Sequence, residues 1–283
     1  SANTEDARNA LQRSLLRSPQ KSTSRLGTEL GVSHMTVLRM LKSLSYYPYR
    51  PRLIHGLHDG DNELRVEFAE EFLSLIDDDD SILDRIIWSD EATFKLNGHI
   101  NAHNCVYWDT ENPMITIDRE RSVGGVTVWC GMWSGGIIGP YTFDGTITGA
   151  AYLTMLNDYF WPVVQSIEDP EELFFQHDGA SVHYTKAVRS WLDEKFPNRW
   201  IGRGGAISWP PRSPDLTPPD FFLWGVLKDA VYAHKPKTVR DLQRHIEDEI
   251  GLLNGELMKK VCQSVPSRLE KCVEKSGAQT ELF

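Results

Sequence analysis

Two short apolar runs, each followed within three residues by an aspartate, constrain the fold of this chain more than any other feature. Residues 86–88 (IIW) precede Asp90, and residues 173–175 (LFF) precede Asp178. Apolar runs of this kind are typical of strands that are buried inside a sheet. We therefore expect both aspartates to lie at or near strand ends.

The rest of the sequence predicts further strands and helices. Apolar residues recur at helical spacing over residues 61–76, which predicts an amphipathic helix, and the four consecutive aspartates at 77–80 predict a solvated loop. Further strands are expected at residues 106–109, 125–136, 139–145 and 199–203. Further helices are expected at residues 148–164, 185–196 and 219–232 and in the tail, 238–275.

Charge is divided unevenly along the sequence. The 283 residues have a net charge of −10, but residues 1–58 carry nine Lys/Arg against three Asp/Glu, a net of +6. The remaining residues carry 21 Lys/Arg against 37 Asp/Glu, a net of −16. A basic head on an acidic body indicates a DNA-contacting module joined to a second domain. An acidic body that also handles DNA would need local basic grooves or metal ions.

The basic head has the pattern of a helix-turn-helix. Helices are expected at 4–17, 22–30 and 34–44, with Gly31 as a left-handed cap and Ser33 as the N-cap of the third helix. The alternative is a plain three-helix cap with solvated Arg and Lys side chains. The residues expected to contact DNA are Ser33, His34, Met35, Arg39 and Lys42, followed by Arg50 and Arg52. The last two lie in a proline-rich segment that suits either a linker along the phosphate backbone or an inert hinge.

A proline-rich stretch, SPDLTPPDFFLWG at 213–225, adds a third acid to the two strand-end aspartates. Pro218 and Pro219 can begin a helix, so Asp220 falls in its first turn, where the helix dipole favours the ionised carboxylate. Asp215 is expected to brace the loop by bonding nearby backbone N–H groups. Each aspartate alone could be a cap or turn residue, but carboxylates that converge from strand ends can hold hard divalent cations.

Three motifs, taken in order, resemble those of the DDE/DDD transposases of the mariner superfamily. They are WSDEATF at 88–94, FQHDGASVHY at 175–184 and SPDLTPPDFFLWG at 213–225, and RLIHGL at 52–57 falls where that family carries an interdomain motif. The resemblance implies an α/β fold, a ribonuclease H-like mixed sheet flanked by helices, preceded by a small all-α helix-turn-helix domain. By motif, it implies that Asp90, Asp178 and Asp220 are catalytic and bind metal, with two Mg²⁺ or Mn²⁺ ions per active site.

We accordingly expect a helix-turn-helix domain at 1–45, a linker at 46–60 and a catalytic domain at 61–283. The resemblance implies endonucleolytic nicking at transposon inverted repeats and strand transfer into target DNA. It also implies double-stranded DNA as the partner, a homodimer and a nuclear location. The alternatives are a domesticated DNA nuclease and a non-catalytic DNA-binding or assembly protein. Three features depart from that family: one helix-turn-helix unit where two are usual, 41 residues between Asp178 and Asp220, more than is common, and Ser181-Val182 where proline is often found.

Other residues are candidates for lesser roles. His183 and Arg212 are candidate active-site neighbours, and the candidate phosphate contacts are Arg119, Arg121, Arg203 and Arg212. The spacing of His99, His103 and Cys105 suggests zinc only loosely. The four cysteines show no CxxC spacing, which favours reduced thiols in an intracellular protein. No apolar run is long enough to span a bilayer.

Overall fold

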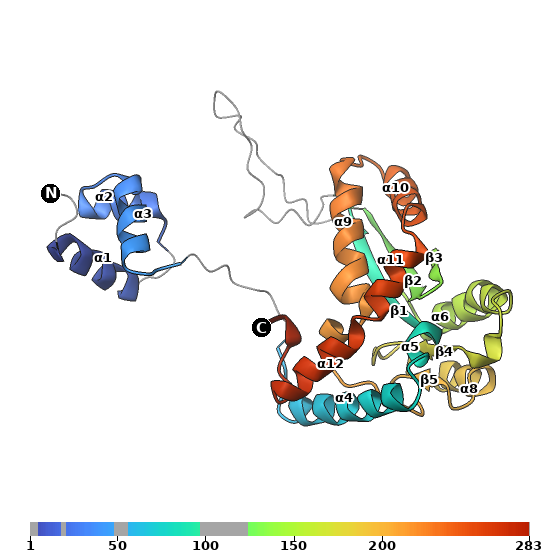
Figure 1. Cartoon of the computed structure of the whole chain (residues 1–283). Coiled ribbons are helices and arrows are strands. Elements are labelled where there is room, and N and C mark those ends of the chain that lie inside the picture. Colours follow the sequence, from blue (N-terminus) through green and yellow to red (C-terminus); the bar gives the residue numbers. More distant parts are fainter. Residues whose placement is uncertain (1–4, 18–20, 48–55, 97–123, 283) are drawn as a thin grey trace. The chain divides into compact units, whose positions relative to one another are not determined.

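The structure is a computed structural model that describes residues 5–17, 21–47, 56–96 and 124–282. The chain divides into two compact units, Ser1–Leu53 and Ile54–Phe283. Each unit buries hydrophobic residues of its own, and Figure 1 labels the elements of both. Among the described residues, no helix is both long enough and apolar enough to cross a membrane.

The N-terminal unit is a small helical domain. Its described helices are α1 (Glu5–Arg17), α2 (Thr23–Leu30) and α3 (His34–Ser43). Its core consists of Leu11, Leu26, Val37 and Met40, which come from all three helices and are completely buried. The three helices expected from the sequence are therefore confirmed, and their apolar faces pack against one another as the helical spacing predicts.

The turn between α2 and α3 has the predicted helix-turn-helix features. Gly31 caps α2 with a φ of 65°, in the left-handed region that glycine adopts without steric cost. Ser33 caps α3, because its hydroxyl accepts a hydrogen bond from the N–H of Thr36 at 3.2 Å. A Cβ atom at Gly27 would lie 2.7 Å from the carbonyl oxygen of Val32. The turn can therefore lie this close to α2 only because residue 27 is glycine.

The C-terminal unit is organised around a five-stranded mixed sheet in the order β3-β2-β1-β4-β5. The strands are β1 (Ile86–Lys95), β2 (Gly125–Trp133), β3 (Gly136–Phe143), β4 (Phe174–Gln176) and β5 (Trp200–Ile201). Strand β1 pairs antiparallel with β2 and parallel with β4. Strands β2 and β3 are antiparallel, and β4 and β5 are parallel. The central strand β1 is thus where the antiparallel and parallel parts of the sheet meet (Figure 1).

Helices cover both faces of this sheet. One core contains residues of α4 (Asp61–Asp78), α5 (Ile82–Arg85), α9 (Trp224–Ala233), α10 (Val239–Gly251), α11 (Gly255–Cys262) and α12 (Val265–Glu274). The other contains residues of α6 (Gly149–Met155), α7 (Trp161–Val164) and α8 (Lys186–Lys195). Since side chains alternate across a strand, Trp88 enters the first core and Ile87 the second.

The described residues contain two short π-helical segments, each of which adjoins an α-helix. Leu156–Phe160 joins α6 to α7, so the helix predicted at 148–164 is present but contains one wider turn. Pro219–Leu223 leads directly into α9 and contains Asp220. Isolated π-helical turns inside α-helices are often found at functional sites.

The mixed sheet flanked by helices confirms the expected fold. The strands predicted at 125–136, 139–145 and 199–203 are present, although β5 has only two residues. Helix α4 extends to Asp78, so part of the acidic run predicted as a loop belongs to the last turn of that helix. The strand predicted at 106–109 lies outside the described residues.

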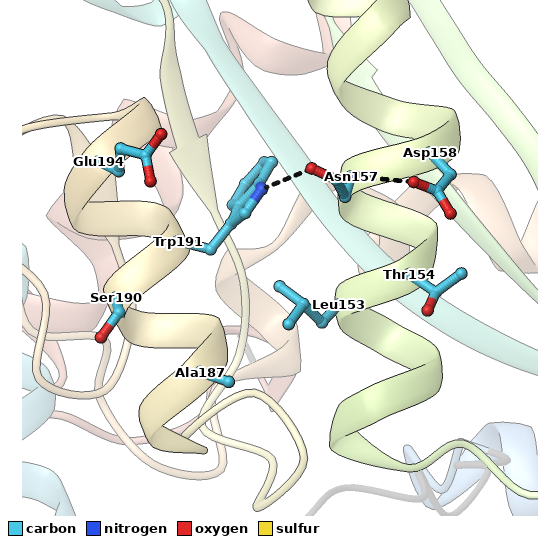
Figure 2. A pocket seen from close by; sticks show the side chains of 8 residues that line it. All are labelled: Leu153, Thr154, Asn157, Asp158, Ala187, Ser190, Trp191 and Glu194. Carbon is cyan, nitrogen blue, oxygen red and sulfur yellow. Dashed lines mark hydrogen bonds between the residues drawn. The ribbon is translucent and has the colours of Figure 1, made fainter.

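A hollow of about 440 Å³ lies between α8 and the helical segment at 149–160 (Figure 2). Trp191 and Asn157 lie on opposite sides of it, and the indole Nε1 donates to Asn157 Oδ1 at 3.4 Å. The aspartates predicted for catalysis are not among its lining residues. The hollow is therefore separate from the carboxylate site that the sequence predicts.

Candidate active site

The parallel pairing of β1 with β4 brings the first two aspartates together. Trp88 pairs with Gln176 in the register of the two strands, and Asp90 and Asp178 each lie two residues further along. The hydroxyl of Ser89, buried to 1% exposure, donates to the carbonyl oxygen of Gln176 at 2.7 Å. This bond ties the end of β4 to the middle of β1, and the two carboxylates therefore lie close to each other. Asp178 lies just beyond a strand end, as expected, but Asp90 does not, because β1 continues to Lys95.

The third aspartate comes from a helix start. Asp220 lies in the π-helical turn that precedes α9, where the hydroxyl of Thr217 donates to Asp220 Oδ2 at 2.9 Å. Trp224 lies four residues later and donates its indole N–H to Asp90 Oδ2 at 2.7 Å. That bond ties the helix start that carries Asp220 to the strand that carries Asp90.

The charges of the three aspartates act on one another. Asp90 keeps some exposed surface, although protein atoms surround most of it. This burial, followed by the charges of Asp220, Glu91 and Asp178, raises the pKa of the Asp90 carboxyl well above its usual value. Within the described part of the chain, no three His, Cys, Asp or Glu side chains are grouped tightly enough to hold a metal ion as they stand. The carboxylates are thus near enough to repel one another without forming a closed ligand cage.

A buried histidine joins Asp178 to Glu91. The Nδ1 atom of His183 lies 2.7 Å from Asp178 Oδ1, and its Nε2 atom lies 3.3 Å from Glu91 Oε1. The His183 ring stacks on His177 with the ring centroids 4.8 Å apart. Because Glu91 follows Asp90 on a strand, their side chains point to opposite faces. His183 therefore reaches the site from the face that α6 and α8 cover.

The contacts of His183 decide its charge and that of Asp178. Burial by itself would lower the pKa of His183, but its hydrogen bonds to Asp178 and Glu91 and their negative charges raise it to about 10. Burial would raise the pKa of Asp178, but the hydrogen bond and charge of His183 outweigh it, and the pKa of Asp178 falls. Burial and the charge of His183 lower the pKa of His177 well below its usual value. At neutral pH, His183 is therefore charged and His177 is neutral.

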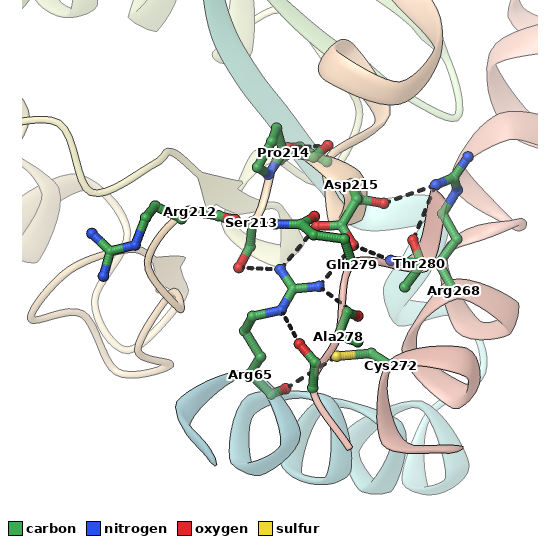
Figure 3. A network of polar contacts seen from close by, with 12 residues as sticks. Arg65, Arg212, Ser213, Pro214, Asp215, Arg268, Cys272, Ala278, Gln279 and Thr280 are labelled. Atoms are coloured by element: carbon green, nitrogen blue, oxygen red, sulfur yellow. Dashed lines mark hydrogen bonds and ion pairs between the residues drawn. The ribbon is translucent and has the colours of Figure 1, made fainter. Parts of the chain in front are cut away.

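The loop that leads into the third motif is anchored by a buried ion pair (Figure 3). Asp215 accepts hydrogen bonds from both Nη atoms of Arg65, at 2.8 and 2.7 Å. The two side chains are 1% and 0% exposed, respectively. Arg65 also donates to Ser213 Oγ at 2.6 Å, and the N–H of Thr280 donates to Asp215 Oδ2 at 2.7 Å. Among the described residues, Asp215 thus braces its loop through distant partners, from α4 and the C-terminal segment, and the expected bonds to nearby backbone N–H groups are not formed.

Two known proteins are similar to this chain over most of its length. The transposase of the transposable element Tc3 from Caenorhabditis elegans is 25% identical over 262 residues, which cover 88% of this chain and 72% of that protein. The histone-lysine N-methyltransferase SETMAR of Homo sapiens is 22% identical over 273 residues, 92% of this chain and 38% of SETMAR. No profile of a known protein family matches the sequence. The chain is a homologue of the mariner/Tc1 transposases.

Solved structures agree with this relationship at the level of the fold. This chain superposes on a Mos1 transposase paired-end complex with a TM-score of 0.73 and 22% identity. The superposition covers 96% of this chain and 79% of the Mos1 chain. A Mos1 mariner paired-end complex with Mn gives a TM-score of 0.73 and 23% identity, covering 95% and 78%. The fold of this chain is therefore that of Mos1 transposase, including its catalytic domain.

The DNA-binding candidates of this chain lie on one exposed stretch of the N-terminal unit. Ser33, His34, Met35, Arg39 and Lys42 are all exposed. They belong to α3 and its cap, so the helix turns one face toward solvent while Val37 and Met40 enter the core. Two further sets of candidates lie outside the described residues. They are the basic residues Arg50, Arg52, Arg119 and Arg121 and the candidate zinc ligands His99, His103 and Cys105.

Arg212, a candidate neighbour of the active site, forms an ion pair with Asp61 at the start of α4. The backbone carbonyl of Arg212 accepts a hydrogen bond from Gln279 Nε2 at 3.0 Å. These contacts hold the proline-rich loop against α4 and the C-terminal segment. They give Arg212 a place in the scaffold that supports the third motif.

Three further residues of this chain contribute to the site, although the sequence analysis did not identify them as candidates. Glu91 directly follows Asp90, and that adjacency was a usable signal. Trp224 lies one helical turn beyond the third acid, a second usable signal. Tyr152 packs its ring against His183 with the centroids 4.3 Å apart. Nothing in the sequence separates Tyr152 from other apolar positions of its helix, so sequence reasoning could not have found it.

Proposed function

We propose that this chain is a mariner-like transposase that nicks DNA at the ends of a transposon and transfers a strand into target DNA. The observation that supports the proposal is that the β1–β4 pairing brings Asp90 close to Asp178, while Trp224 ties the helix start that carries Asp220 to Asp90. The helix-turn-helix geometry of the N-terminal unit supports it. So does the likeness to the Tc3 transposase and to the Mos1 strand transfer complex.

Asp90, Asp178 and Asp220 are the residues that would hold Mg²⁺ or Mn²⁺. The donor set fits, because carboxylate oxygens are the ligands that these hard cations prefer. Burial, followed by the charges of neighbouring acids, raises the pKa of Asp90, and a cation would relieve the repulsion between these charges. Mos1 paired-end complexes are described with Mn and with Mg. Two bound ions would supply an activated water and stabilise the leaving oxygen in phosphoryl transfer.

The surrounding side chains prepare these carboxylates. Trp224 orients Asp90 through its indole N–H, and Thr217 orients Asp220 through its hydroxyl. The imidazolium of His183 holds Asp178 in its ionised form. Each of the three acids therefore has a hydrogen-bond donor that limits its rotation, which is what a ligand needs if it is to hold a fixed position.

DNA recognition is assigned to the N-terminal unit, with residues 1–45 as the DNA-binding domain, 46–60 as the linker and 61–283 as the catalytic domain. In a helix-turn-helix, the second helix of the motif enters the major groove, and here that helix is α3. Ser33, His34 and Met35 lie at its N-terminal end, and Arg39 and Lys42 lie further along the exposed face. Arg50 and Arg52 would follow the phosphate backbone. We further propose a homodimer that pairs two transposon ends in the nucleus.

A plasmid assay tests the proposal. Supercoiled DNA incubated with the full chain and Mg²⁺ or Mn²⁺ should be nicked, and a labelled donor strand should become joined to it. Asp178→Asn should abolish both activities. The matched control is Asp248→Asn, which neutralises an exposed acid on α10. If Asp178→Asn nicks as fast as the wild type, the site is misplaced. If nicking occurs without joining, the chain is a nuclease that does not insert.

A further inference from the structure

Two arginines converge on one exposed tyrosine next to the candidate active site. The guanidinium carbon of Arg189, in α8, lies 4.4 Å from the centroid of the Tyr184 ring, and that of Arg203 lies 4.3 Å from the same centroid. The tyrosine is 37% exposed. Cation–π contacts of this kind stabilise each pair modestly, yet they bring two like charges to a single ring.

In the part of the chain that the structure describes, no acid neutralises this pair of charges. Among the residues that the structure describes, neither Arg189 nor Arg203 has a carboxylate within ion-pair distance. The Nε–H of Arg189 is buried and has no hydrogen-bond acceptor there. Residues 59–283 contain 37 acids and 21 bases, so an acidic partner was available in composition. Two guanidiniums held together without a counter-charge favour an external anion.

The geometry of the pair is built into the chain. Arg203 follows β5, and Gly204 comes next with a φ of 80°, a conformation that favours glycine. A Cβ atom at Gly204 would lie 3.1 Å from Tyr184 Cε2 and 4.0 Å from Arg189 Cδ. The glycine therefore lets the loop after β5 pack against the tyrosine and places Arg203 beside it.

The pair also lies beside the proposed chemistry. Tyr184 directly follows His183, whose ring is 2.7 Å from the Asp178 carboxylate. Tyr184 is also the last residue of the second motif, so an anion bound at its ring would lie against the segment that carries Asp178. A DNA strand that placed one phosphate at Asp178 would therefore carry a neighbouring phosphate past Arg189 and Arg203.

We propose that Tyr184, Arg189 and Arg203 form a binding site for a DNA backbone phosphate next to the phosphate that is cut. The inference rests on the proposed function for the identity of the strand. Guanidinium groups offer planar, forked donors that match phosphate oxygens, and the tyrosine keeps the two forks in place between binding events. This site supplies the local positive charge that the acidic C-terminal unit needs in order to approach DNA.

The test is the salt dependence of DNA binding by the full chain. Each phosphate contact that is lost lowers the slope of log affinity against log salt by roughly 0.9 for duplex DNA. The double variant R189Q/R203Q should therefore lower the slope for a short duplex oligonucleotide by roughly 0.9 or more. The single variant R203Q, at an exposed loop position, should lower it by a smaller amount and should not affect folding. The matched control is R240Q, which removes one charge from an exposed position in α10.

The outcomes separate this site from the catalytic proposal. A lower slope in R189Q/R203Q and R203Q, but not in R240Q, supports the site even if the wild type never nicks DNA. An unchanged slope in both variants overturns it, even if the wild type nicks and joins DNA normally. A thermal shift with inorganic phosphate that both variants lose, combined with an unchanged slope for DNA, would show a site for small anions and would also overturn the proposal. If R189Q/R203Q fails to fold, R203Q alone decides.

Discussion

Replacing Asp215 by asparagine should destabilise the C-terminal unit far more than an ordinary loop substitution. The Arg65 guanidinium, which is 0% exposed, keeps its charge in this variant. It loses the carboxylate that accepts two of its hydrogen bonds in the wild type. Removing one partner of a buried ion pair typically costs about 3–5 kcal/mol, because the remaining charge stays buried without compensation. For a unit of this size, each kcal/mol lowers the melting temperature by about 2–4 °C. The expected fall is therefore on the order of 6–20 °C.

Differential scanning fluorimetry and urea unfolding of the full chain measure this effect. The control is Glu194→Gln, which breaks the ion pair with Lys195 in which Glu194 is 69% exposed. That substitution should change stability by less than about 1 kcal/mol, because exposed ion pairs contribute little. The double variant Arg65→Met/Asp215→Leu should be more stable than Asp215→Asn alone, since it removes both charges.

The reasoning would be refuted if Asp215→Asn and Glu194→Gln lowered the melting temperature equally. In that case, water or a rearranged side chain must satisfy Arg65, and the ion pair would not hold the loop of the third motif in place. A large loss of stability with full nicking activity in the surviving folded fraction would leave the structural role intact. It would also separate that role from catalysis.

Four further predictions follow from the sites described. Asp220→Asn should lower metal-dependent plasmid nicking by roughly a thousandfold or more while the far-ultraviolet circular dichroism stays unchanged; appreciable nicking would remove it from the ligand set. His183→Ala should lower the nicking rate, or raise the Mg²⁺ concentration needed for half-maximal nicking, by about 10- to 100-fold. A Mg²⁺ titration curve identical to that of the wild type would contradict the positioning role of His183. Arg212, the neighbour that donates to Asp61, lowers the pKa of that carboxyl to about 2, followed by the backbone N–H of His58. Since this pKa lies below the unfolded value of about 3.9, the contribution of Asp61 to stability is complete above about pH 3.9 and is lost as the pH falls toward 2. In Asp61→Asn, the urea midpoint of unfolding should therefore change less between these two pH values than in the wild type. Ser33→Ala should cost the N-terminal unit about 1 kcal/mol of unfolding free energy, measured by thermal unfolding.

The sequence predicted the elements of the site better than it predicted their partners. Asp178 could be placed just beyond a strand end because the apolar run before it is a local signal, and Asp220 could be placed at a helix start because two prolines precede it. The same reasoning was wrong for Asp90, because β1 continues past it to Lys95. The bond from Trp224 to Asp90 crosses 134 residues, and the pairing of Arg65 with Asp215 crosses 150. Contacts over such separations depend on how helices cross the sheet, which periodicity does not specify.

Position on a strand explains why Glu91 was missed. Neighbouring residues on a strand point to opposite faces. Glu91 therefore meets His183 on one side of the sheet, and Asp90 meets Trp224 on the other. The sequence supplies both acids, and only the three-dimensional arrangement shows that they serve different partners.

The Arg65 network also sets an order in time for the synthesis of this chain. Arg65 must wait for the carbonyl of Gly277, 212 residues later, before its Nε–H has its partner. At translation rates of about 5–20 residues per second, that wait is roughly 10–40 s. The N-terminal unit has no such delay, because its Lys21–Glu29 contact joins residues only eight apart. A nascent chain can therefore hold a folded N-terminal unit for many seconds before the Arg65 network, which anchors the loop of the third motif, is complete.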